Sequence, residues 1–105
     1  MRRGDVYELC LAKATGHEQR GRRFGVVVQA DAFLPRSVVL VAPTSRSARS
    51  ATFRPEIVVD GETTRVLVEQ VGAVDVSRLA NQVGHASAEE IWGIDESLMT
   101  VLGLG

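Results

Sequence analysis

The chain has 105 residues, 45% of them hydrophobic and 24% charged, which is the composition of a soluble globular protein and not of a disordered or fibrous one. This length predicts one domain over residues 1–105, and no apolar run approaches the roughly 18 residues of a membrane span. No apolar segment of a signal peptide follows the basic N-terminus, so we expect a cytoplasmic protein with no membrane partner. The single cysteine, Cys10, permits no internal disulfide, and we expect it to be a small packing residue.

The net charge of −1 conceals an asymmetry between the two halves of the chain. Residues 1–54 hold ten Lys and Arg against four Asp and Glu, whereas residues 55–105 hold two against nine. The basic half predicts a local electropositive surface despite the nearly neutral total. The acidic half offers a surface to the same chain or to a partner.

Strand-like stretches dominate the first 85 residues. Two of them are continuous β-branched runs, which predict burial on both faces, and Asp60-Gly61 supplies the tight turn of a hairpin. We expect a mobile loop over 44–53, because it is small, polar and basic without periodicity. Residues 31–35 and 75–79 are expected to be turns, the second being a brief turn or a single helical turn. The expected strands are 6–11, 26–29, 37–42, 56–59, 64–68, 70–74 and 82–85.

One helix is expected, at the C-terminus, where Ser87 and Glu90 form a capping box and Gly103 is a natural stop. Its apolar positions recur on one face, at Ile91, Ile94, Leu98, Val101 and Leu102. Trp92 is expected to pack on the sheet or at a subunit contact. Short antiparallel strands closed by one helix predict a mainly β (α+β) fold, a small barrel without exposed sheet edges.

A basic loop is the most informative part of the chain. Arg20, Arg22 and Arg23 lie within four positions between glycines, directly before a valine-rich strand. Such a loop either holds an anion among its guanidinium groups or is a solvated turn. Thr44 and Ser45 stand where a later strand gives way to a loop, a place that positions reactive groups well, although a turn-capping hydroxyl is the alternative for Thr44.

Other kinds of site find no support in the sequence. The two histidines, His17 and His85, lie far apart without neighbouring Cys or paired carboxylates, so we expect no metal site. The glycines form neither a Walker loop nor a dinucleotide fingerprint, and we expect no cofactor.

Taken in order, these segments resemble the MazF/PemK-type toxins of type II toxin–antitoxin systems, which are sequence-selective endoribonucleases. The resemblance extends over nearly the whole chain. It is carried by Arg3-Gly4-Asp5-Val6-Tyr7, Gly16-His17-Glu18-Gln19, Gly21-Arg22-Arg23, Pro43-Thr44-Ser45, Val68-Glu69-Gln70, Asp75 with Arg78-Leu79, Gly84, Ile94-Asp95-Glu96-Ser97-Leu98 and Leu102-Gly103-Leu104.

The resemblance implies an SH3-like antiparallel barrel of the CcdB/PemK type, a homodimer, single-stranded RNA as substrate and neutralisation by an antitoxin with an acidic disordered segment. It implies metal-independent cleavage to a 2′,3′-cyclic phosphate and a 5′-OH, with Arg23 and Thr44 as the catalytic residues. Arg23 suits electrostatic stabilisation, because its pKa is too high for a general base. The residues expected to bind the substrate are His17, Glu18, Gln19, Arg22, Ser45, Glu69 and Gln70. His85 is expected to be structural.

Two departures from the family pattern keep other functions open. Phe24 stands where the family usually has Pro, and Gly72 stands where it has Arg. Phe24 either changes how rigidly Arg23 is held or stacks on a base, and Gly72 removes a positive group. The alternatives are a non-enzymatic toxin or binding module on the same barrel, as in relatives that poison DNA gyrase, and a catalytically weakened RNA binder.

Overall fold

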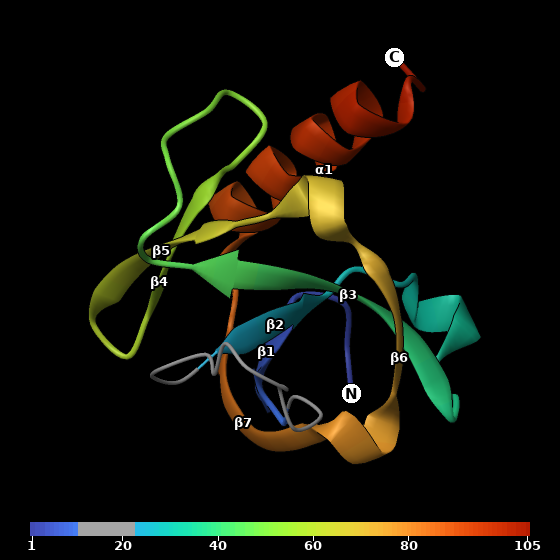
Figure 1. The fold of residues 1–105 in the computed structure, drawn as a ribbon. Helices are drawn as coiled ribbons and strands as arrows, with labels where there is room; N and C mark the ends of the chain where they lie inside the picture. Colours follow the sequence, from blue (N-terminus) through green and yellow to red (C-terminus); the bar gives the residue numbers. More distant parts are fainter. Residues whose placement is uncertain (11–22) are drawn as a thin grey trace, which may run out of the picture.

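The computed structural model describes residues 1–10 and 23–105. In this part of the chain an antiparallel sheet curls into a small barrel, and one helix lies across its side (Figure 1). The strands are β1 (Asp5–Leu9), β2 (Phe24–Val27), β3 (Val38–Ser45), β4 (Glu56–Val59), β5 (Glu62–Val66), β6 (Gly72–Asp75) and β7 (Leu79–His85). Three short 3-10 helices, η1 (Asp31–Phe33), η2 (Val68–Gln70) and η3 (Val76–Arg78), join them, and α1 (Ala88–Leu102) follows.

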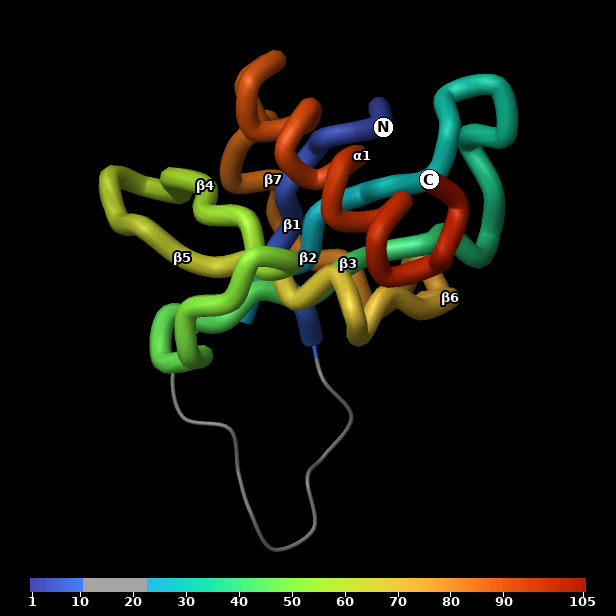
Figure 2. The backbone as a smooth tube through the Cα atoms, turned by 90° about the horizontal axis from the view of Figure 1, so that it is seen from above, coloured from blue at the N-terminus to red at the C-terminus, as the bar shows by residue number. Residues whose placement is uncertain are grey.

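β3 organises the sheet, because it pairs with three other strands along its length. Its first half pairs with β6, its middle with β2 and its end with β5, within the order β4-β5-β3-β2-β1-β7. Changing partners along one strand curls the sheet, as the tube in Figure 2 also shows. The expected small antiparallel barrel with a C-terminal helix is confirmed, and so is the short helical turn within 75–79. The expectation that it has no sheet edges is wrong, because among the described residues the sheet stays open, with β4 and β7 at its two ends.

Pro43 does not end this strand, contrary to the expected range of 37–42. β6 pairs with β3 only as far as Val41 and β5 begins to pair at Thr44, so Pro43 lies between the two partners. Its carbonyl accepts a hydrogen bond from the Leu67 N–H at 2.8 Å. A proline is tolerated where no ladder N–H is needed, and the strand therefore continues to Ser45.

The core lies between the curled sheet and α1. It is formed by side chains from five strands, η2 and the helix, namely Val6, Val26, Ala42, Ile57, Val59, Val66, Val68 and Ile94. Val26 and Val27 are both buried, which confirms the expected burial on both faces of β2. The same expectation is wrong for the start of β3, where Val38 is 46% and Leu40 is 43% exposed. There β3 lies far from α1, which leaves one face of the strand uncovered (Figure 1).

The helix begins and ends as its sequence predicts. Glu90 N–H donates to Ser87 Oγ at 3.1 Å and Ser87 N–H donates to Glu90 Oε1 at 2.9 Å, which completes the capping box. Gly103 ends the helix with a φ of 70°. Trp92 is 66% exposed, so the expectation that it packs on the sheet is wrong. No helix in the described residues is long and apolar enough to cross a membrane.

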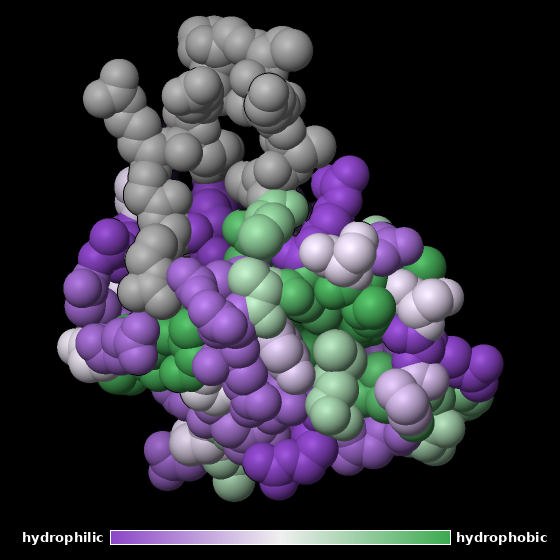
Figure 3. Space-filling model, turned by 90° about the horizontal axis from the view of Figure 1, so that it is seen from below, coloured by the Kyte–Doolittle hydropathy of each residue, from purple (hydrophilic) through white to green (hydrophobic). Residues whose placement is uncertain are grey.

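Apolar residues also reach the surface at the end of α1. Figure 1 shows its last turns rising away from the strands, and Met99, Leu102 and Leu104 are 45%, 54% and 71% exposed. The face seen from below in Figure 3 carries separate hydrophobic areas between hydrophilic ones. Cys10 is also exposed, directly after β1, so the expectation that it packs in the interior is wrong.

The tight turn that precedes β1 lies against the end of β7 and the first turn of α1. The buried Asp5 carboxylate accepts a hydrogen bond from the Arg2 N–H at 2.8 Å and lies 2.8 Å from His85 Nδ1. Gly4 has a φ of +95°, and a Cβ there would lie 2.7 Å from Ile91 Cδ1. These contacts agree with the structural role expected for His85.

Candidate functional site

The two residues expected to be catalytic lie at the same end of two paired strands. Arg23 directly precedes β2, and its carbonyl accepts a hydrogen bond from the Leu9 N–H at 2.9 Å. Thr44 is the penultimate residue of β3. The β2–β3 register pairs Gly25 with Pro43, so Arg23 and Ser45 each lie two residues beyond this last pair. The fold therefore brings together residues that are 21 positions apart in the sequence.

Both side chains keep their polar groups available. Within the described residues, neither the Arg23 guanidinium nor the Thr44 hydroxyl makes a hydrogen bond or an ion pair. Arg23 is half-buried, and Thr44 is only 2% exposed, so packing restricts the position of the hydroxyl. A guanidinium and a hydroxyl at neighbouring strand ends are both donors that suit phosphate oxygens.

Gly25 allows the close approach of strands on which this arrangement depends. A Cβ at this position would lie 2.4 Å from Val41 Cγ1 and 3.0 Å from Leu9 Cδ2. A side chain there would force β2 away from β3 and move Arg23 relative to Thr44. The glycine after the basic loop thus sets the spacing of the site.

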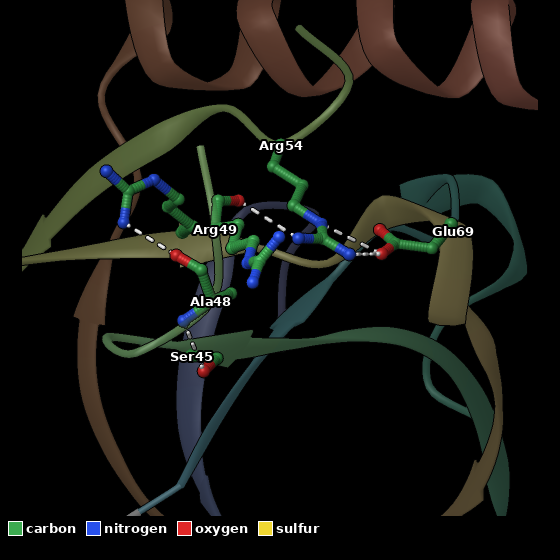
Figure 4. A network of polar contacts seen from close by, with 6 residues as sticks. Ser45, Ala48, Arg49, Arg54 and Glu69 are labelled. Atoms are coloured by element: carbon green, nitrogen blue, oxygen red, sulfur yellow. Dashed lines mark hydrogen bonds and ion pairs between the residues drawn. The ribbon is translucent and has the colours of Figure 1, made fainter. Parts of the chain in front are cut away.

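Ser45 has a structural contact on the side where β3 ends. Its Oγ accepts a hydrogen bond from the Ala48 N–H at 3.1 Å, which turns the chain into the loop 46–55. Arg65 of β5 binds the same turn, because its Nη1 donates to the Ala48 carbonyl at 2.9 Å. Its Nη2 also lies 3.1 Å from Glu56 Oε2 at the start of β4. The loop directly after Thr44 therefore has fixed contacts with β3 and β5 (Figure 4).

Arg54 ties the far end of this loop to η2. Its Nε and Nη2 donate to Glu69 Oε2 at 2.9 and 2.7 Å, and its Nη1 donates to the Arg49 carbonyl at 2.9 Å (Figure 4). The guanidinium carbon also lies 5.4 Å from the centre of the Phe53 ring. Burial acts to raise the pKa of Glu69, but the hydrogen bonds and the charge of Arg54 outweigh it and lower that pKa.

Arg54 has no recognisable signal in the sequence. It lies in a loop without periodicity and 15 positions from Glu69, so no local spacing connects the two. Glu69 is paired in the described structure, whereas Gln70 is an exposed residue of η2. His17, Glu18, Gln19 and Arg22 lie outside the described residues.

Comparison with known proteins decides the family. Residues 2–102 match the family of PemK-like, MazF-like toxins of type II toxin–antitoxin systems. The chain belongs to this family. It is 39% identical over 104 residues to the toxin candidate Rv3098A of Mycobacterium tuberculosis, covering 97% of each chain. It is 32% identical over 117 residues to endoribonuclease MazF9 of the same organism, covering 99% of this chain and 98% of the relative.

The fold is shared with solved members of the family. A mycobacterial endoribonuclease, solved in complex with its cognate antitoxin, superposes with a TM-score of 0.80. The alignment covers 100% of this chain and 97% of the other, with 19% sequence identity. MazF of Deinococcus radiodurans superposes with a TM-score of 0.80 as well, at 25% identity over 99% of this chain and 97% of the other, so the curled sheet and the terminal helix are the MazF arrangement.

The structure also accounts for one of the two departures from the PemK/MazF pattern. Phe24 packs against the hydrophobic core, so it anchors the main chain beside Arg23 from within. This packing favours a role in holding Arg23 over a role in stacking on a base. At Gly72 a Cβ would meet only the Gln70 carbonyl, at 3.9 Å, so the space for a side chain is open.

Proposed function

We propose that this toxin is a sequence-selective endoribonuclease that cleaves single-stranded RNA without a metal ion and is neutralised by a cognate antitoxin. The single observation that supports the reaction is that Arg23 and Thr44 lie at adjoining ends of β2 and β3, with no partner for either polar group within the described residues. Membership of a toxin family and an endoribonuclease relative support the same activity. Residues 1–105 form one toxin domain in this proposal.

The residue types suit cleavage by transesterification. The ribose 2′-OH attacks the adjacent phosphorus and the bond to the 5′ oxygen breaks, which leaves a 2′,3′-cyclic phosphate and a 5′-OH. Charge builds on the phosphoryl oxygens during this step, and Arg23 and Thr44 donate hydrogen bonds to them.

The proposal includes a homodimer. The apolar stripe of α1 is covered at Ile94 but continues onto the exposed Leu102 beyond the strands. If a second copy of the chain packed against the C-terminal end of α1, this exposed apolar surface would be removed from water. An antitoxin with an acidic segment is the other partner, since such a segment can occupy basic sites that bind phosphates. The proposal includes a cytoplasmic location, because the proposed substrate, single-stranded RNA, is available there.

Incubation of the purified protein with a long single-stranded RNA in EDTA tests the activity. Mapped ends should carry cyclic phosphates and 5′-OH groups. Arg23→Ala and Thr44→Ala should each reduce the cleavage rate by about 10²–10³, the usual effect of losing one donor to a developing oxyanion. Arg36→Ala, a charge loss at an exposed residue away from the site, should cleave like the wild type.

Intact RNA combined with retained toxicity in cells would replace the proposed reaction with a non-enzymatic toxin. RNA that is bound but never cut would instead indicate a weakened RNA binder.

A further inference from the structure

The loop 46–55 carries three arginines in different electrostatic surroundings. Arg46 forms an ion pair with Glu62, and Arg54 forms one with Glu69 at 2.7 Å. Arg49 is exposed and, within the described residues, has no acidic partner for its guanidinium. Within residues 1–10 and 23–105, one cation of this loop is therefore left without a counter-ion, five residues after Thr44.

The main chain around Arg49 is nevertheless fixed. The Ala48 N–H donates to Ser45 Oγ, and the Ala48 carbonyl accepts from Arg65 at 2.9 Å. The carbonyl of Arg49 itself accepts from Arg54 Nη1 at 2.9 Å. Figure 4 shows these contacts arriving from β3, β5 and the far end of the loop. The main chain that carries Arg49 therefore loses little conformational freedom when the side chain binds an anion, and only the side chain has to be ordered.

We propose that Arg49 binds a backbone phosphate of the RNA strand and that Arg54 is the positioning residue that holds it there. This inference rests on the proposed function, because the loop begins at the strand end that carries Thr44. Arg54 acts through the loop in this proposal, since its Nε, Nη1 and Nη2 donate to Glu69 and to the Arg49 carbonyl and so hold the guanidinium in place. Glu69 is likewise a positioning residue in this proposal: it holds Arg54 and does not contact the bases of the RNA.

Binding of a fully 2′-O-methylated single-stranded RNA, which cannot be cleaved, tests this directly. Affinity is measured by fluorescence anisotropy over a series of salt concentrations. Arg49→Ala should weaken binding about tenfold, the effect of one charge-assisted hydrogen bond. The slope of log K against log salt should fall by about 0.7 in magnitude, because one phosphate contact of a single strand is lost. Arg36→Ala, an exposed charge removed elsewhere, should change neither quantity.

A double-mutant cycle separates the two roles. Arg54→Lys keeps the charge but not the fork that reaches both Glu69 and the Arg49 carbonyl. Alone it should weaken RNA binding and speed amide exchange over residues 48–50. In the Arg49→Ala background, Arg54→Lys should cause no further loss of affinity, because Arg54 affects RNA binding only by positioning the Arg49 side chain, which is then absent. Additive losses would make Arg54 a direct RNA contact and overturn the positioning role.

The remaining outcomes are also distinct. If the wild type cleaves RNA but Arg49→Ala binds it normally, this inference fails and the proposed function stands. If Arg49→Ala instead weakens only the antitoxin complex, Arg49 belongs to a protein interface. If RNA binding depends on Arg49 but the wild type cuts no RNA, the proposed reaction fails and the phosphate contact stands.

Discussion

At the scale of single residues, arginines that reach main-chain carbonyl groups shape the surroundings of the candidate site. Arg54 and Arg65 each combine an ion pair with a hydrogen bond to the loop backbone. A planar guanidinium can do both at once, because its donors point in several directions. The consequence is that a loop expected to be mobile has defined contacts at three points.

The Arg54–Glu69 pair predicts a loss of stability in acid. The folded-state pKa of Glu69 is lowered, so its contribution to stability is present above the unfolded pKa of about 4.3 and is lost as the pH falls through the lower folded pKa. Glu69→Gln should therefore lower Tm at pH 7, and the difference from the wild type should shrink in acid. Thermal unfolding followed by circular dichroism checks this. A difference that does not vary with pH would contradict it.

Gly4 provides a second prediction, with Gly84 as a matched control. Gly4→Ala places a Cβ at a φ of +95° and 2.7 Å from Ile91 Cδ1, whereas a Cβ at Gly84 has nothing within 4 Å. We expect Gly4→Ala to destabilise the fold by about 2 kcal/mol and Gly84→Ala to be nearly neutral. Urea unfolding measures both, and equal effects would show that the positive φ is not what selects glycine at Gly4.

At the scale of elements, the helix is joined to the sheet through its first turn. Glu90 closes the capping box with Oε1 and accepts a hydrogen bond from the Val58 N–H of β4 through Oε2 at 2.8 Å. This contact also covers a main-chain donor at the edge of the sheet, where β4 has a partner on one side only. One carboxylate thus supports two elements.

The capping box can be tested by removing the Ser87 hydroxyl. Ser87→Ala leaves the Glu90 N–H without its acceptor and should cost about 1 kcal/mol of unfolding free energy. Chemical denaturation gives the value. Ser37→Ala, at an exposed serine outside the helix, is the control and should stay within about 0.5 kcal/mol of the wild type. A Ser87→Ala protein as stable as this control would exclude a stabilising cap.

At the scale of the whole molecule, the uneven coverage by α1 is the main feature. The helix covers one part of the sheet, while its own last turns and the start of β3 remain exposed (Figure 1). A 15-residue helix cannot cover all of a curled sheet, so apolar surface is left at the margins. In the proposed homodimer, a second copy of the chain buries the exposed end of α1.

Disrupting this end should separate the proposed dimer. Leu102 is 54% exposed in the single chain, and Leu102→Glu would bring two carboxylates into the interface. Light scattering after gel filtration should then give the mass of one chain. Val58→Lys adds a charge at a residue of similar exposure, 60%, on β4 and should leave the dimer intact. A dimeric Leu102→Glu protein would place the interface elsewhere.

Local patterns in the sequence determined the valine-rich strands, the Asp60-Gly61 hairpin, the capping box and the helix stop, because turn chemistry and capping act over a few residues. The order of motifs also pointed to the family and to Arg23 and Thr44. Only the tertiary structure decided that β3 continues through Pro43, that Cys10 and Trp92 are exposed, and that Arg54 pairs with Glu69. These features depend on which strands and loops meet in space, and contacts between distant segments leave no periodic signal in one sequence.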